Sequence, residues 1–227
     1  MRNLAASAAC AIGLSFFVAR APAAASHQSY TYVVMHPVYG EIGSFTHTIE
    51  RTADTSKINT YLRIAVKMLG IVAYYEEADG TEVLRGDRLV SLQNVTNKNG
   101  TQIEVRGESQ GDKFVVSSPA GTFVAPADVA PSDPWFVNPT GLRSMVSTKT
   151  GKVEQARVLD AESTTISLDG VSVPVRHFTI VSTNRQEVWL DSHNVPLLFR
   201  THVDGTQIDF KLKTSLSDRD LPSENGQ

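Results

Sequence analysis

Short runs of apolar and β-branched residues, separated by turn residues, follow one another along most of the chain. Residues 29–36 (SYTYVVMH) are rich in β-branched and aromatic types, and residues 42–51 (IGSFTHTIER) alternate, with Phe45, His47 and Ile49 on one face. Alternation of this kind places successive side chains on opposite faces of a half-buried strand. We therefore predict two strands, joined by a glycine-containing turn.

Residues 57–69 (KINTYLRIAVKML) fit two patterns. Apolar side chains from Leu62 to Met68 alternate as in a strand, whereas another apolar set fits a helical stripe with Ser56 as its N-cap and Gly70 as its stop. We favour a strand, because the neighbouring segments are strands and the run leads directly into residues 71–78 (IVAYYEEA).

Turn signals then recur at short intervals. Pairs of glycine with aspartate or asparagine tolerate the positive φ that tight hairpins require. We predict turns at Asp79-Gly80, Gly86-Asp87, Asn99-Gly100, Gly111-Asp112, Asp169-Gly170 and Asp204-Gly205. We predict the later strands at residues 89–96, 101–109, 113–118, 152–161, 164–168, 171–182, 185–191, 196–203 and 206–214.

Five prolines interrupt this rhythm in residues 119–141, where we expect an irregular connection and, at about 140–147, a short helix. The spacing of roughly 8–12 residues between turns predicts an all-β fold. We expect one antiparallel meander, spanning residues 26–214 and curled into a half-open or closed barrel. Residues 215–227 are expected to form a disordered tail.

The N-terminus has the pattern of a secretory signal peptide. Arg2 precedes an uncharged apolar run, and small residues at Ala23 and Ala25 give the A-x-A spacing of a cleavage site. The run of about 16 residues is short for a membrane span of about 20. We predict a signal peptide over residues 1–25, and hence export to the bacterial periplasm or the extracellular space; retention as an anchor, or lipidation at Cys10, are the alternatives.

Composition then excludes several classes of function. Without Arg2 and Arg20, Lys and Arg fall from 21 to 19 against 24 Asp and Glu, so the mature charge is near −5 and nucleic acid is not an expected partner. The single cysteine, Cys10, lies in the predicted signal. A cysteine nucleophile, a cysteine-based zinc site and an iron–sulfur cluster are therefore excluded for the mature chain.

The segment RQEVWLDSHNVPLLFRTHVDGTQIDF (residues 185–210) concentrates acids and imidazoles, at Asp191, His193, His202 and Asp204. Turn residues account for three of these side chains, while His202 falls on a strand face with Leu198 and Arg200. The spacing matches no metal-binding signature. We therefore interpret the segment as hairpins, and a metal or acid–base site is the alternative.

Four further groups could carry chemistry. His47 and His177 lie on otherwise apolar strand faces, where a hydrogen-bonded core histidine is the simpler interpretation. The carboxylates Glu76, Glu77, Asp79 and Glu82 surround a predicted turn, so we expect a solvated hairpin tip rather than a glycosidase pair. Asn94 begins a glycosylation sequon. Trp135 either caps an apolar cavity or plugs a barrel end, and Trp189 is the other tryptophan.

The whole pattern resembles an uncharacterised family of exported bacterial proteins known only as a domain of unknown function. The matching pieces are YTYVVMHPVYGEIG, LRIAVKMLGIVAYYEEADGTEVLRGDRLVSLQNVTNKNG, PAGTFVAPADVAPSDPWFVNPT and EVWLDSHNVPLLFRTHVDGTQIDFKL, within residues 30–213. Leu84 and Leu190 depart from the family, whose members often have aromatic residues there, and this weakens the case for an aromatic ligand wall. The resemblance implies a fold similar to the half-barrels of envelope lipid and lipoprotein carriers, and it implies no activity.

These observations lead to a non-enzymatic exported protein that binds an apolar or amphipathic molecule against an apolar, chemically inert inner wall. We assign no catalytic residue, metal ligand or cofactor, and leave the ligand-binding residues and the oligomeric state open. The alternatives are an envelope structural or partner-binding protein and a hydrolase using His47, His177 or the aspartates of residues 185–210.

Overall fold

The structure is a computed structural model that describes residues 25–136, 140–203 and 205–217. Within these ranges the chain forms strands joined by turns and bends, with no helix. None of the described segments could therefore cross a membrane as a long apolar helix.

Fifteen strands make up the described chain. They are β1 (Ser26–His36), β2 (Gly40–Arg51), β3 (Thr55–Met68), β4 (Ile71–Arg85), β5 (Arg88–Lys98), β6 (Thr101–Gln110), β7 (Lys113–Ser118), β8 (Gly121–Pro126), β9 (Ala130–Pro131), β10 (Gly141–Val146), β11 (Val153–Leu168), β12 (Val171–Val181), β13 (Arg185–Leu190), β14 (Pro196–Val203) and β15 (Thr206–Ser217).

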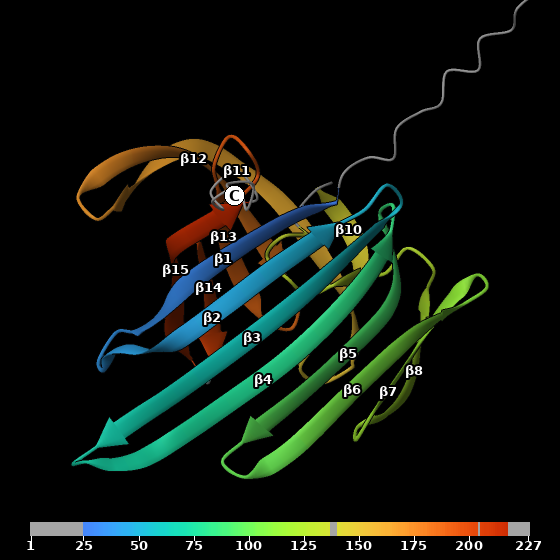
Figure 1. Cartoon of the computed structure of the whole chain (residues 1–227), viewed down its shortest axis with the longest axis horizontal. Coiled ribbons are helices and arrows are strands. Elements are labelled where there is room, and N and C mark those ends of the chain that lie inside the picture. Colours follow the sequence, from blue (N-terminus) through green and yellow to red (C-terminus); the bar gives the residue numbers. More distant parts are fainter. Residues whose placement is uncertain (1–24, 137–139, 204, 218–227) are drawn as a thin grey trace, which may run out of the picture.

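All of these strands belong to one sheet, in the order β8-β7-β6-β5-β4-β3-β2-β1-β15-β14-β13-β12-β11-β10-β9. Strands that follow one another in the chain are neighbours, except for β8 and β9, which lie at the two ends of the sheet. β15 pairs antiparallel with β1, with Val34 opposite Phe210. Only the short β9–β10 pair is parallel. The fold is thus a meander whose first and last strands are joined, and the long hairpins of β1–β6 curve across the front of Figure 1.

The sheet curls until its two ends approach each other. β8 comes near β10 and β11, and β9 comes near β5, but β8 and β9 are not neighbours in the sheet. Pro126 ends β8 and Pro131 ends β9, and proline has no N–H with which to complete a ladder. The predicted all-β fold is confirmed, as a barrel left open along the β8/β9 seam.

The concave face of the sheet carries the main core. Tyr32, Val34, Phe114 and Phe178 are fully buried there. A smaller cluster, formed by Val175, Trp189 and Leu197 with partly buried neighbours, lies apart from it. Strand β13 explains the division, because Val188 and Leu190 join the main core while Trp189, between them, belongs to the smaller cluster on the opposite face.

The prediction of a short helix at about 140–147 is wrong, because β10 occupies residues 141–146 and pairs antiparallel with β11. The turn expected at Asp79-Gly80 is also wrong, since β4 runs through both residues. The hairpin turn instead lies at Leu69-Gly70, where both residues have positive φ. The segment left open between strand and helix is a strand, β3, as favoured.

Other boundaries differ less. The strands predicted at 152–161 and 164–168 form one strand, β11, with an irregularity between Asp160 and Ser163. The turns predicted at Asn99-Gly100 and Asp169-Gly170 are confirmed. β15 continues to Ser217, into the predicted tail. Asp204, the rest of the tail and nearly all of the predicted signal peptide (residues 1–24) lie outside the described residues.

Candidate functional site

A cavity of about 480 Å³ lies inside the curl of the sheet. This volume falls in the range of small-molecule sites, roughly 300–1,000 Å³. The apolar part of its lining comes mainly from strands far apart in the chain and includes Phe45, Leu62, Ile103, Phe199 and Phe210. The polar part includes Thr60, Glu76, Glu82, Thr96, Asp133, Lys149 and His202.

Aromatic rings form one side of the cavity. Phe199 and Phe210 stack with centroids 4.3 Å apart, and Phe45 meets both edge-on, at 5.8 and 5.9 Å. Tyr32 packs against Phe199 at 5.1 Å. An aromatic wall is therefore present although Leu84 and Leu190 are not aromatic; both of these leucines are buried in the core.

Tyr32 also links the two halves of the sheet. Its hydroxyl on β1 donates a hydrogen bond of 2.8 Å to the carbonyl of Pro196 on β14. Burial raises the pKa of Tyr32 well above its ordinary value, so this group remains a neutral donor. The bond holds the aromatic side of the cavity to the first hairpin.

Polar side chains form a row across the concave face. His47, Thr60, Gly80 and Asn94 are consecutive partners across β2, β3, β4 and β5. A Cβ atom at Gly80 would lie 2.4 Å from Thr60 Oγ1 and 3.0 Å from Asn94 Oδ1, so a larger residue there would force these two side chains to move. Asn94 in turn donates to Thr96 Oγ1 at 2.9 Å. The Asp-Gly pair that predicted a turn thus marks a close side-chain approach within a strand.

The Pro-rich connection covers one end of this row. Trp135 stacks on His47 with ring centroids 4.6 Å apart and contacts Tyr30 at 4.5 Å. Asp133 accepts a 2.8 Å hydrogen bond from the Trp135 backbone N–H, and its Oδ2 lies 3.5 Å from His47 Nε2. His47 is completely buried, and neither of its ring nitrogens has a hydrogen-bond partner among the described residues.

Glu82 is a second buried acid at the cavity. It is 3% exposed, and its Oε2 has no hydrogen-bond partner among the described residues. Burial, and secondarily the negative charge of Asp133, raise the pKa of Glu82 well above its ordinary value. Glu82 therefore keeps its proton to higher pH than an exposed glutamate, and an unpaired carboxyl group faces the cavity.

Glu76 behaves in the opposite way. Although burial pushes its pKa upward, this is outweighed by Lys149, whose Nζ lies 2.7 Å from Glu76 Oε1, and by a hydrogen bond from the Tyr74 hydroxyl and the charge of Lys98. The pKa of Glu76 is lowered, and the group is a paired carboxylate. The expected solvated hairpin tip at residues 76–82 is therefore wrong, because two of its four acids, Glu76 and Glu82, are buried inside the barrel.

The other candidate residues are dispersed. Asp191 Oδ1 accepts hydrogen bonds of 2.8 Å from the backbone N–H groups of His193 and Val195, which is a turn-forming role. His202 lines the cavity, and its Nδ1 is buried without a partner among the described residues. His177 stacks on Trp189 at 4.5 Å with its Nε2 3.5 Å from Glu187, on the face opposite the cavity. His47 and His177 therefore do not converge.

The prediction of an apolar, chemically inert inner wall is wrong, because ionisable side chains also line the cavity: Glu76, Glu82, Asp133, Lys149 and His202. Sequence reasoning did not single out Asp133 or Lys149, because both lie in connections, and only the closure of the sheet brings them to the cavity. No cluster of three or more His, Asp or Glu suited to a metal ion occurs in the described ranges.

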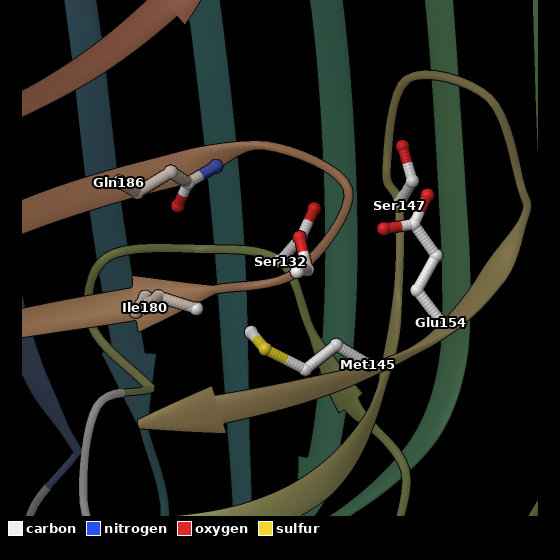
Figure 2. Close-up of a pocket in the computed structure, with 7 residues that line it drawn as sticks. Ser132, Met145, Ser147, Glu154, Ile180 and Gln186 are labelled. Atoms are coloured by element: carbon white, nitrogen blue, oxygen red, sulfur yellow. The ribbon is translucent and has the colours of Figure 1, made fainter. Parts of the chain in front are cut away.

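Three further hollows occur among the described residues, of which only the smallest shares lining residues with the cavity. A space of about 30 Å³ shares Ser132, Ser147 and Gln186 with it, and Figure 2 shows Met145 and Ile180 pointing toward each other beside Ser132. A space of this size suits one or two water molecules rather than a ligand. Two hollows at the open seam, of about 570 and 540 Å³, share Arg143 and Asp128.

The chain belongs to a family described as a domain of unknown function, DUF6134, whose model matches residues 40–213. In overall shape it is similar to a beta-barrel-like protein of domain of unknown function DUF1849 from Brucella abortus. The two share 10% sequence identity and a TM-score of 0.65, over 84% of this chain and 97% of the other. No curated protein matches the sequence. The similarity shows the barrel-like fold and leaves the activity open.

Proposed function

We propose that this chain is an exported protein, of the bacterial periplasm or the extracellular space, that binds an amphipathic molecule in its interior cavity without covalent chemistry. The single observation that carries the proposal is a cavity of about 480 Å³ with an aromatic wall on one side and unpaired buried polar groups on the other. Ligand pockets combine a mostly apolar lining with a few convergent polar groups in this way.

The aromatic wall would take the apolar part of the ligand. Phe45, Phe199 and Phe210 already contact one another, so an alkyl chain laid against them buries apolar area without requiring them to rearrange. The polar part of the ligand would meet Glu82 and His202, whose unpaired atoms leave hydrogen-bonding capacity for a partner.

The export part of the proposal rests on the signal-like N-terminus and on the absence of cysteine after residue 10. A domain without disulfides in an oxidising compartment relies on its core, and this chain is long enough to build one.

Native mass spectrometry and lipid extraction of the purified protein test the binding. We expect a co-purified amphiphile, or uptake of one from a panel containing a fatty acid, a fatty amine, a fatty alcohol and a phospholipid. Thr201→Phe narrows the cavity and should reduce uptake, whereas Thr214→Phe, on an exposed part of β15, should not. A ligand-free mass for the wild type, with no uptake from the panel, overturns the proposal.

A partner-binding role is the second candidate, and the open seam favours it. β8 is the last strand at one end of the sheet and exposes Val124. An edge strand of this kind offers unpaired backbone groups to another chain. In-cell crosslinking from residue 122, also exposed on β8, should then capture a protein, and replacement of Val124 by proline in the same chain should abolish the capture.

A further inference from the structure

Two neighbouring hairpin turns expose an unusual set of apolar side chains. The set, which we call the apolar tips, consists of Val38, Tyr39, Met68, Leu69, Ile71 and Val72. They lie at the β1–β2 and β3–β4 turns, which reach the same end of the sheet (Figure 1). Tyr39 and Met68 connect the two turns through a contact of 3.9 Å between the hydroxyl and the sulfur. The two turns, and the apolar tips on them, therefore lie side by side.

Leu69 lies at a turn position where a leucine side chain does not stabilise the fold. It is fully exposed (103%) and has a φ of 51°. The matching turn positions elsewhere hold Asn99 (φ 50°) and Asp169 (φ 48°), each followed by glycine as Leu69 is. Asparagine and aspartate tolerate this left-handed conformation, whereas a bulky apolar residue is strained in it. The sequence thus keeps an apolar side chain at an apex where a polar one would fit the turn better.

The charge near the tips differs from that of the whole chain. The turns at residues 36–40, 67–71 and 98–101 contain Lys67 and Lys98, and one exposed acid, Glu41, follows the first of them, while the chain carries a net charge of −3. Protruding aliphatic side chains beside lysine and tyrosine are typical of surfaces that enter a lipid interface. The lysines complement an anionic lipid surface.

The exposed end of the interior cavity lies at the same end of the sheet. Lys98 and Lys149 are exposed lining residues, Lys98 is the β5 partner of Glu76, and Lys149 pairs with Glu76. Tyr74, which also lines the cavity, follows the tip residue Val72 by two positions along β4. A lipid surface touching the apolar tips would therefore lie close to this end of the cavity.

We propose that the apolar tips dock this protein onto an anionic lipid surface, with Leu69 and Ile71 entering the interface. A protein partner would require a complementary flat or concave match. Isolated side chains projecting from convex turns, with lysines beside them, fit a fluid surface better. The docking does not depend on ligand binding in the cavity, so either proposal can fail without the other.

Co-sedimentation with vesicles tests the docking. We expect the wild type to bind vesicles of equal parts phosphatidylethanolamine and phosphatidylglycerol more tightly than vesicles of phosphatidylcholine. Leu69→Asn combined with Ile71→Ser should weaken binding about ten-fold or more, because two aliphatic side chains leave the interface. Val171→Asn changes another exposed apolar residue, beside the β11–β12 turn; it is the control and should bind as the wild type does.

The single variant Leu69→Asn separates docking from folding. Asparagine fits the positive φ at this turn, so its melting temperature should equal or exceed that of the wild type while vesicle binding falls. Unchanged binding of the double variant, or no binding of the wild type to either vesicle, overturns the proposal. The latter result would leave a protein partner as the explanation of the tips.

Discussion

Replacement of Phe199 by alanine is the most informative perturbation of the aromatic wall. The ring is 9% exposed and contacts Tyr32, Phe45 and Phe210, on three other strands. Buried phenylalanine-to-alanine changes cost about 3–5 kcal/mol in free energy of unfolding. Because one side of this ring borders a cavity, we expect the lower value, about 3 kcal/mol.

Urea and thermal unfolding measure this loss. For a domain of this size, about 3 kcal/mol corresponds to a fall in melting temperature of roughly 6–12 °C. A double-mutant cycle of Phe199→Ala with Phe45→Leu should show a coupling free energy of about 0.5–1.5 kcal/mol, as expected for an edge-to-face pair. The exposed Val124→Ala serves as control and should change stability by less than about 0.5 kcal/mol.

A loss below about 1 kcal/mol for Phe199→Ala, far from the range for buried rings, would refute the reasoning. The ring would then be solvated, and β14 could not be curled against β2 across the cavity. A normal loss without measurable coupling to Phe45 would keep the burial and contradict the specific ring contact.

Three further predictions concern stability. Folding raises the pKa of Glu82, so the stability that this group contributes is greatest below the ordinary glutamate pKa and is lost as pH rises toward the raised value. The free energy of unfolding of Glu82→Gln should therefore increase relative to that of the wild type as pH rises from 5 to 8. A difference that does not change with pH in urea titrations contradicts this. Tyr32→Phe removes the hydrogen bond to the buried Pro196 carbonyl and should lower the free energy of unfolding in urea by about 1–3 kcal/mol. Tyr39→Phe, at an exposed tyrosine, should leave it almost unchanged, and equal effects of the two variants would speak against the buried bond. Gly107→Ala places a Cβ atom 2.5 Å from the Phe114 ring and should lower the free energy of unfolding by about 1–3 kcal/mol. Adding Phe114→Leu to the same chain should recover part of this loss, and strictly additive losses in thermal unfolding would argue against the clash.

The fold was largely predictable because its determinants are local. Alternation along each strand and the pairs Asn99-Gly100 and Asp169-Gly170 define hairpins from a few residues. Asp79-Gly80 carries the same local signal, yet Gly80 lies inside β4, where it pairs with Thr60 on one side and Asn94 on the other. That pairing depends on neighbouring strands, so the Asp-Gly pair alone could not reveal it.

The candidate site was less predictable because it depends on closure. The wall formed by Phe45, Phe199 and Phe210 exists only once β15 pairs with β1, at opposite ends of the chain. Asp133 reaches His47 through an irregular connection that has no periodic pattern. Sequence reasoning could place Phe45 and His47 on one face, but it could not show which acids would face them.

The central claim, a hollow interior that takes an amphiphile, is tested most directly by tryptophan quenching with a long-chain alcohol brominated on its alkyl chain. Trp135 stacks on His47 beside the cavity, whereas Trp189 lies in the cluster on the opposite face. These are the two tryptophans of the chain, so Trp189→Phe and Trp135→Phe isolate each in turn. We expect saturable quenching of Trp135 in the first variant and none of Trp189 in the second. Equal quenching of both, or of neither, would contradict the claim.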